Sequence, residues 1–108
     1  MRTKEGQEKH DKFVGTAALF LKQKGFNKMY VDLPNFAKPP KVNGYIPDIY
    51  AVKTKLLISG LTLPVETLLV EVETEDTQNT MSAMLQHFAF QKWASENRQT
   101  FFEVIIAK

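Results

Sequence analysis

The feature that most constrains this chain is a strand-like segment, Leu69–Thr74, in which two glutamates interrupt an apolar run. Side chains alternate between the two faces of a strand, so Glu71 and Glu73 share one face, opposite the valines between which they lie. The flanking leucines and valines indicate a central strand, where carboxylates are rarely buried without a partner. The segment therefore predicts a sheet that carries an acidic site on one of its faces.

A second acid-bearing strand is predicted earlier in the chain, at residues 46–53, and Asp48 follows a proline near its start. If the two strands pair, Asp48 joins Glu71 and Glu73 in one carboxylate cluster. Clustered carboxylates repel one another, and a hard divalent cation such as Mg²⁺ offsets that repulsion and activates water against phosphate esters. The alternatives are a turn aspartate after proline at Asp48 and a solvated strand face at the two glutamates.

Length and composition bound the class of protein. The chain has 108 residues, enough for one modest core, so we expect residues 1–108 to form a single domain. It contains no cysteine, which excludes a disulfide framework, thiolate zinc ligands and a cysteine nucleophile. No apolar run approaches the roughly 20 residues of a membrane helix, and the charged N-terminus is unlike a signal peptide. We therefore expect a cytoplasmic protein without a membrane partner.

Charge is distributed unevenly along the chain. Residues 1–55 contain 11 Lys/Arg and 5 Asp/Glu, whereas residues 56–108 contain 3 and 7. One interpretation is a basic surface for a polyanion beside an acidic metal pocket. The other is a solvated surface whose charges mix after folding. Under the first interpretation, the candidates for contacts with a nucleic-acid backbone are Lys38, Lys41, Lys53 and Lys55.

Hydrophobic periodicity and turn residues predict six regular elements. Helices are expected at residues 7–24 and 80–97, and strands at 29–33, 46–53, 65–74 and 101–107. Residues 55–65 are compatible either with a hairpin or with a break at Gly60 and Pro64. The last strand is almost continuously apolar, so we expect it to be buried on both faces. The second helix is expected to bury the stripe of Met81, Met84, Leu85 and Phe88.

The order of elements is helix, three strands, helix, strand. The last strand follows a helical crossover, so it should run parallel to one of its neighbours. The sequence therefore predicts an α/β fold with a mixed four-stranded sheet flanked by helices.

This order and its motifs resemble the PD-(D/E)XK nuclease superfamily, whose core is shared by restriction endonucleases and Holliday-junction resolvases. In that superfamily a strand with Pro-Asp precedes a partner strand with an acid, one spacer and a lysine. Pro47-Asp48 matches the first motif, and Glu71-Val72-Glu73 matches the second except that Glu73 stands in the lysine position. A similar Glu-x-Glu variant occurs in small bacterial members. Some relatives with Glu-x-Glu are active, and others with a changed motif have lost activity.

The resemblance implies an αβββαβ restriction-endonuclease-like core and a Mg²⁺- or Mn²⁺-dependent nuclease acting on DNA. In such an enzyme Asp48 and Glu71 would hold the ion, while Glu73 would orient or deprotonate the attacking water or bind a second ion. Lys92 would supply the positive charge of the motif lysine that Glu73 replaces, and so stabilise the transition state. The alternative is a nuclease fold without catalysis that binds nucleic acid or a protein partner. A core of this size offers little surface to enclose a duplex, which favours a homodimer.

Two histidines complete the set of candidates. His10 lies on the first helix, where some relatives place another polar ligand, and His87 lies on the second helix as a phosphate contact or a half-buried imidazole. For His10 the sequence favours an exposed helix residue, and for His87 it favours a half-buried imidazole with a structural role.

Overall fold

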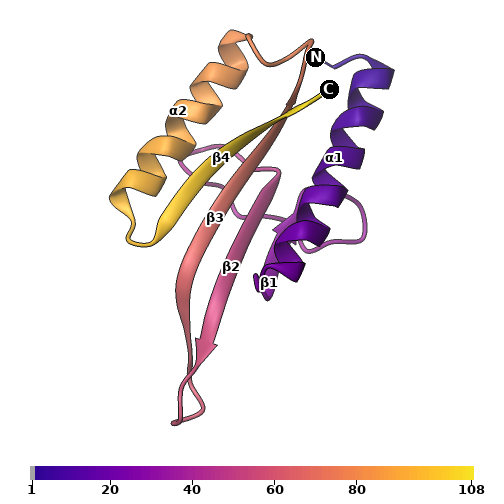
Figure 1. Cartoon of the computed structure of the whole chain (residues 1–108). Coiled ribbons are helices and arrows are strands. Elements are labelled where there is room, and N and C mark those ends of the chain that lie inside the picture. The colour runs from indigo at the N-terminus through magenta and orange to yellow at the C-terminus, as the bar shows by residue number, and fades with distance from the viewer. Residues whose placement is uncertain (1) are drawn as a thin grey trace.

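The computed structural model describes residues 2–108 and contains a four-stranded sheet with two helices (Figure 1). The strands lie in the order β1-β2-β3-β4; β1, β2 and β3 are antiparallel neighbours, and β4 runs parallel to β3. The predicted mixed sheet and its parallel last strand are confirmed. The elements are α1 (Lys4–Gln23), β1 (Lys28–Val31), β2 (Ile49–Leu56), β3 (Thr62–Thr74), α2 (Met81–Glu96) and β4 (Thr100–Ala107).

The two helices cover opposite faces of the sheet, and each face has its own apolar cluster (Figure 1). On the α1 face, Val14 packs with alternate strand residues such as Val70 and Val72. On the α2 face, Phe90 packs with Leu69. The alternation along β3 therefore sends the valines towards α1 and leaves the glutamates between them to the α2 face.

Side-chain caps set where the helices begin. Thr3 accepts a hydrogen bond from the Gly6 amide (2.9 Å) and starts α1 three residues earlier than the apolar stripe predicted. Thr80 caps α2 in the same way, accepting from the Ala83 amide (3.1 Å). Gly25 follows α1 with φ +101°, a left-handed conformation that suits glycine after a helix.

The β2–β3 hairpin extends beyond the rest of the molecule (Figure 1). Residues 55–65 form its far end, and Pro64 lies within β3 opposite Thr54. The register shifts there and skips Val65, so a bulge accommodates the proline without ending the strand.

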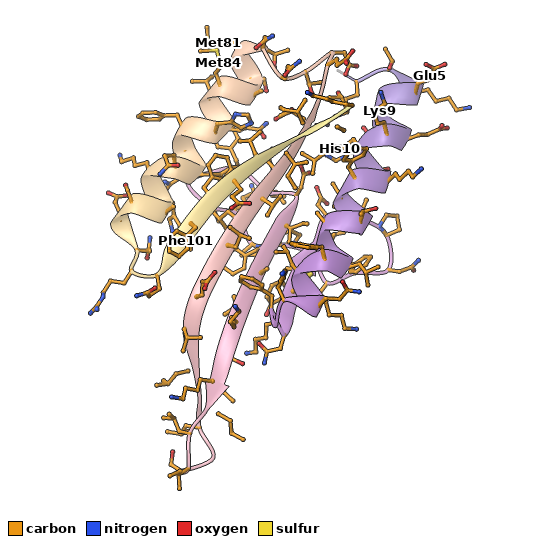
Figure 2. All side chains as sticks on the ribbon, viewed as in Figure 1. Glu5, Lys9, His10, Met81, Met84 and Phe101 are labelled. Atoms are coloured by element: carbon orange, nitrogen blue, oxygen red, sulfur yellow. The ribbon has the colours of Figure 1, made fainter. Side chains whose placement is uncertain are left out.

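The predicted core stripe of α2 is wrong. All four residues of the stripe are exposed: Leu85 by 51%, Met84 by 58%, Met81 by 68% and Phe88 by 71%. Figure 2 shows Met81 and Met84 on the side of α2 that faces away from the sheet. The buried face consists of Phe90 and three alanines, whose small side chains let the helix approach the sheet closely. Residue size at helical spacing identified the wrong side of this helix.

The predicted burial of β4 on both faces is also wrong. Among the residues that the structure describes, β4 pairs only with β3 and so forms an edge of the sheet. Phe101 is 50% exposed and Val104 is 39% exposed. A continuous apolar strand predicts a central position, and the fold of the single chain does not supply a neighbour on its outer side.

Candidate metal centre

The end of β3 carries two buried carboxylates to the α2 face. Glu71 is 4% exposed and Glu73 is 3% exposed. Asp48 lies just before β2 and makes two hydrogen bonds to β3, one as donor and one as acceptor. Its amide donates to Glu71 Oε1 (2.8 Å), and the Val72 amide donates to Asp48 Oδ2 (2.7 Å). The convergence of the three acids that strand alternation predicted is therefore present.

Three side chains surround the Glu73 carboxylate. Thr77, in the turn between β3 and α2, donates its hydroxyl to Oε1 (2.8 Å). Arg2 Nη2 lies 3.5 Å from the same oxygen and donates to the Val72 carbonyl (3.0 Å). His87 Nε2, on the inner face of α2, lies 2.9 Å from Oε2. Glu73 is thus held in one orientation by groups from three separate parts of the chain.

Glu71, Glu73 and His87 form the cluster with metal-ligand geometry. One ligand atom from each of the three residues lies within 4.8 Å of the other two. Two carboxylate oxygens and an imidazole nitrogen are a donor set for a divalent cation. The sequence favoured a structural role for His87. Its spacing of four after Ala83 and three before Phe90, both buried, is the signal that places it on the inner face of α2.

His10 lies on α1 (Figure 2), and the expectation of an exposed side chain there is wrong. Its ring is buried, with Nε2 3.1 Å from Asp48 Oδ2 and Nδ1 2.9 Å from Asp11 Oδ1. Burial lowers the pKa of His10, but the contacts with Asp48 and Asp11 outweigh it and raise the pKa above 6.5. A protonated His10 would partly neutralise Asp48 from outside the three-residue cluster.

Glu71 is the most perturbed acid of the site. Burial raises the pKa of Glu71 to about 9, and the neighbouring charges of Asp48 and Glu73 act in the same direction. Only the hydrogen bond from the Asp48 amide and the charge of Arg2 oppose this change. In the protein without a cation, Glu71 is therefore protonated at neutral pH, because its surroundings disfavour another negative charge.

A cavity of about 350 Å³ opens beside these groups. Its lining contains the acids Asp48, Glu71 and Glu73, and also Arg2, which contacts Glu73, and the first turns of α2. The N-terminus of a helix carries partial positive charge and free amide groups, which attract anions. The cavity therefore combines a cation-binding wall with groups that favour a negatively charged ligand.

The predicted lysines do not line this cavity. Lys92 is exposed on α2, Lys41 is exposed in the loop before β2, and Lys55 is exposed in the hairpin. Lys38 Nζ lies 3.5 Å from Asp32 Oδ1, and Lys53 Nζ lies 4.8 Å from the centre of the Phe26 ring. Their contacts with nucleic acid and the catalytic role of Lys92 stay predictions.

Arg2 and Thr77 were missed by the sequence analysis. Arg2 reaches Glu73 from 71 positions away in the chain, and Thr77 donates to it from the turn between β3 and α2. The strand pattern carries no information about either contact.

Comparison with known proteins gives no relative. No protein-family model matches the chain, and neither a curated protein nor a solved structure matches it. The resemblance to PD-(D/E)XK nucleases thus stays a prediction. Within residues 2–108, neither helix has the length and apolar character needed to span a bilayer.

Proposed function

We propose that this chain is a divalent-cation-dependent nuclease that hydrolyses phosphodiester bonds in DNA. The observation that carries the proposal is one cavity lined both by the acids Glu71 and Glu73 and by Arg2 and the first turns of α2. A cation-bound phosphodiester needs carboxylates that share the ion with it. It also needs positively charged groups or amides near its remaining negative oxygens.

Glu71, Glu73 and His87 are the residues that would hold the ion, with Asp48 beside them. The donor set fits a cation because three carboxylates crowd at this point and the pKa of Glu71 is raised to about 9. An imidazole nitrogen among the ligands suits Mn²⁺ at least as well as Mg²⁺. When bound, the ion would polarise a phosphoryl oxygen and lower the pKa of the attacking water.

The chain itself contributes three functions in this proposal. Arg2 and the first amides of α2 bind the non-reacting phosphate oxygens. Glu73, fixed by Thr77, accepts the proton of the attacking water. Glu71 must lose its proton before it can act as a ligand, so ion binding releases protons and tightens as pH rises.

Calorimetry tests the ion site directly. We expect Mn²⁺ to bind at a single site with release of protons, and Glu71→Gln or His87→Ala to weaken that binding. Glu75→Gln is the matched control, because Glu75 is an exposed acid in the same acidic run. Equal Mn²⁺ affinity in Glu71→Gln and in the unchanged protein would contradict the ligand assignment.

Cleavage assays test the reaction. Linear, nicked and branched DNA are incubated with Mn²⁺ or Mg²⁺, and products are expected only when the ion is present. Asp48→Ala should abolish the products, because Asp48 is bonded to both Glu71 and the β3 backbone. Cleavage that survives Asp48→Ala would show that the activity comes from another site or from a contaminant.

The second candidate is a nuclease fold without catalysis that binds nucleic acid or a protein. The observation in its favour is that, over residues 2–108, no lysine lines the cavity. The position expected for the motif lysine holds Glu73, whose oxygens already contact Thr77 and His87. Ion binding without cleavage of any DNA, together with DNA binding measured by fluorescence anisotropy, would favour this candidate.

A further inference from the structure

The outer edge of β4 is an unprotected strand. Within the part of the chain that the structure describes, β4 pairs with β3 along Thr100–Ala107 and has no strand on its other side. Every second residue of an edge strand turns its N–H and C=O groups outward. Proteins usually blunt such edges with lysine, proline or a bulge. β4 contains neither residue, keeps an unbroken register with β3, and has Glu103 as its one charged residue.

Apolar side chains flank this edge on both faces of the sheet. On the α1 face, the exposed Phe20 and Phe101 line one cavity beside the start of β4. Figure 2 shows Phe101 at that end of β4. On the α2 side, Val104 on β4 and the helix residues Met84 and Phe88 are exposed. Those two residues lie seven positions before Gln91 and Ser95, which line the same cavity, so they share that side of the helix.

We propose that β4 pairs antiparallel with β4 of a second copy of this chain, joining two four-stranded sheets into one of eight strands. A second copy is the occupant because a strand edge is self-complementary under twofold symmetry. It supplies the missing hydrogen bonds and covers the apolar flanks of both edges at once. The pairing also makes β4 a central strand, which its apolar sequence predicts.

The register follows from the faces of β4. Ile105 packs on the α1 face, so Val104 points to the α2 face. In antiparallel pairing, residues opposite each other lie on the same face of the sheet. The twofold axis therefore lies between the two copies of one residue, which face each other. An axis at Glu103 would place two carboxylates opposite one another, which is unfavourable. An axis at Val104 pairs Glu103 with Ile105 and uses residues 101–107 of both strands.

The area available agrees with a dimer of ordinary size. The five flanking apolar side chains expose on the order of 500 Å², taking roughly 150–200 Å² for a large side chain. Stable interfaces bury about 800 Å² on each partner, and the paired backbones and neighbouring polar side chains supply the remainder. Glu103 of each copy faces an isoleucine rather than an acid, so no like charges lie directly opposite across the twofold axis.

Cysteine crosslinking tests the register, because the chain has no cysteine of its own. Val104→Cys should form a disulfide-linked dimer under mild oxidation, since directly opposed residues lie at about 4.5–5.5 Å between Cα atoms. Glu103→Cys is the matched control on the same edge, where the two cysteines are diagonal neighbours at roughly 7–8 Å. Ile58→Cys, fully exposed at the hairpin tip, measures random collision.

We expect Val104→Cys to crosslink roughly ten-fold or more faster than Ile58→Cys, since paired cysteines have an effective concentration in the millimolar range. Light scattering at about 100 µM should give a dimer mass for the unchanged chain and a monomer mass for Val104→Lys, because a lysine on the edge disfavours pairing. Circular dichroism verifies that Val104→Lys is folded. A monomeric unchanged chain, or crosslinking of Val104→Cys no faster than that of Ile58→Cys, would overturn the proposal.

Discussion

Replacement of Glu71 by glutamine should stabilise this protein at neutral pH when no cation is present. Glutamine has nearly the same shape, and its oxygen can accept the hydrogen bond from the Asp48 amide that Glu71 Oε1 accepts at 2.8 Å. It cannot ionise. The substitution therefore removes the acid whose charged form is disfavoured by burial and by Asp48.

The size of the effect follows from the pKa of Glu71. In the unfolded chain the carboxyl has its ordinary pKa of 4.5, whereas in the folded protein the pKa is about 9. Between these values the unfolded state binds fewer protons, so the free energy of unfolding falls as pH rises. At about 1.4 kcal/mol per pH unit, the loss accumulated from pH 4.5 to pH 7 is about 3 kcal/mol. Below pH 4.5 this loss disappears.

Urea denaturation in the presence of a chelator measures the difference at several pH values. Glu71→Gln should exceed the unchanged protein by about 3 kcal/mol at pH 7, which is about 10–20 °C in Tm for a domain of this size. His10, whose raised pKa also favours the fold at low pH, is present in both proteins and cancels in the comparison. Glu75→Gln, on an exposed acid, should change stability by less than about 0.5 kcal/mol.

Two outcomes would refute this reasoning. Glu71→Gln no more stable than the unchanged protein at pH 7 would mean that the site tolerates the Glu71 charge. An equal gain at pH 4 and pH 7 would mean that the gain does not come from ionisation. Addition of Mn²⁺ gives a further comparison, because an ion that binds only the folded state raises stability by about 2.7 kcal/mol at 100 times its Kd. That increase should be smaller in Glu71→Gln.

Phe90→Ala should lower the free energy of unfolding by about 3–5 kcal/mol because it empties the α2 face of the core, whereas Met81→Ala, at an exposed position of α2, should change it by less than about 0.5 kcal/mol; equal effects in urea denaturation would contradict the orientation of α2. Thr80→Ala should cost about 1 kcal/mol through the lost cap to the Ala83 amide, measured in the same way; a neutral result would contradict that cap. His87→Ala should weaken Mn²⁺ binding about ten-fold or more in calorimetry; unchanged affinity would remove His87 from the ligand set.

The order of elements and the meeting of the acids were predictable because both follow from local rules. The period of two along β3 fixes which residues share a face, and the proline before Asp48 starts the strand beside it. The crossover through α2 fixes β4 as parallel to a neighbour. The only contacts between distant residues that these inferences need are the pairings of the strands.

The rest of the site was not predictable because it depends on such distant contacts. Arg2 reaches Glu73 only because the chain enters α1 beside the end of β3. His87 joins the acids only because α2 presents its alanine-rich side to the sheet. Which residue completes the cluster thus depends on how α2 is rotated, and the large residues of that helix pointed to the opposite rotation.

Pairing of β4 with a second copy would account for part of both errors about burial. Apolar patterning records which side chains are protected from water in the working protein, and the structure describes one copy of the chain. Met84 and Phe88 on α2 and Val104 on β4 were all predicted to be buried, and all three are exposed in the single chain. Pairing of β4 with a second copy would bury the outer edge of this strand. Crosslinking of Val104→Cys would therefore indicate that the predicted burial holds in the dimer and is wrong only for the single chain.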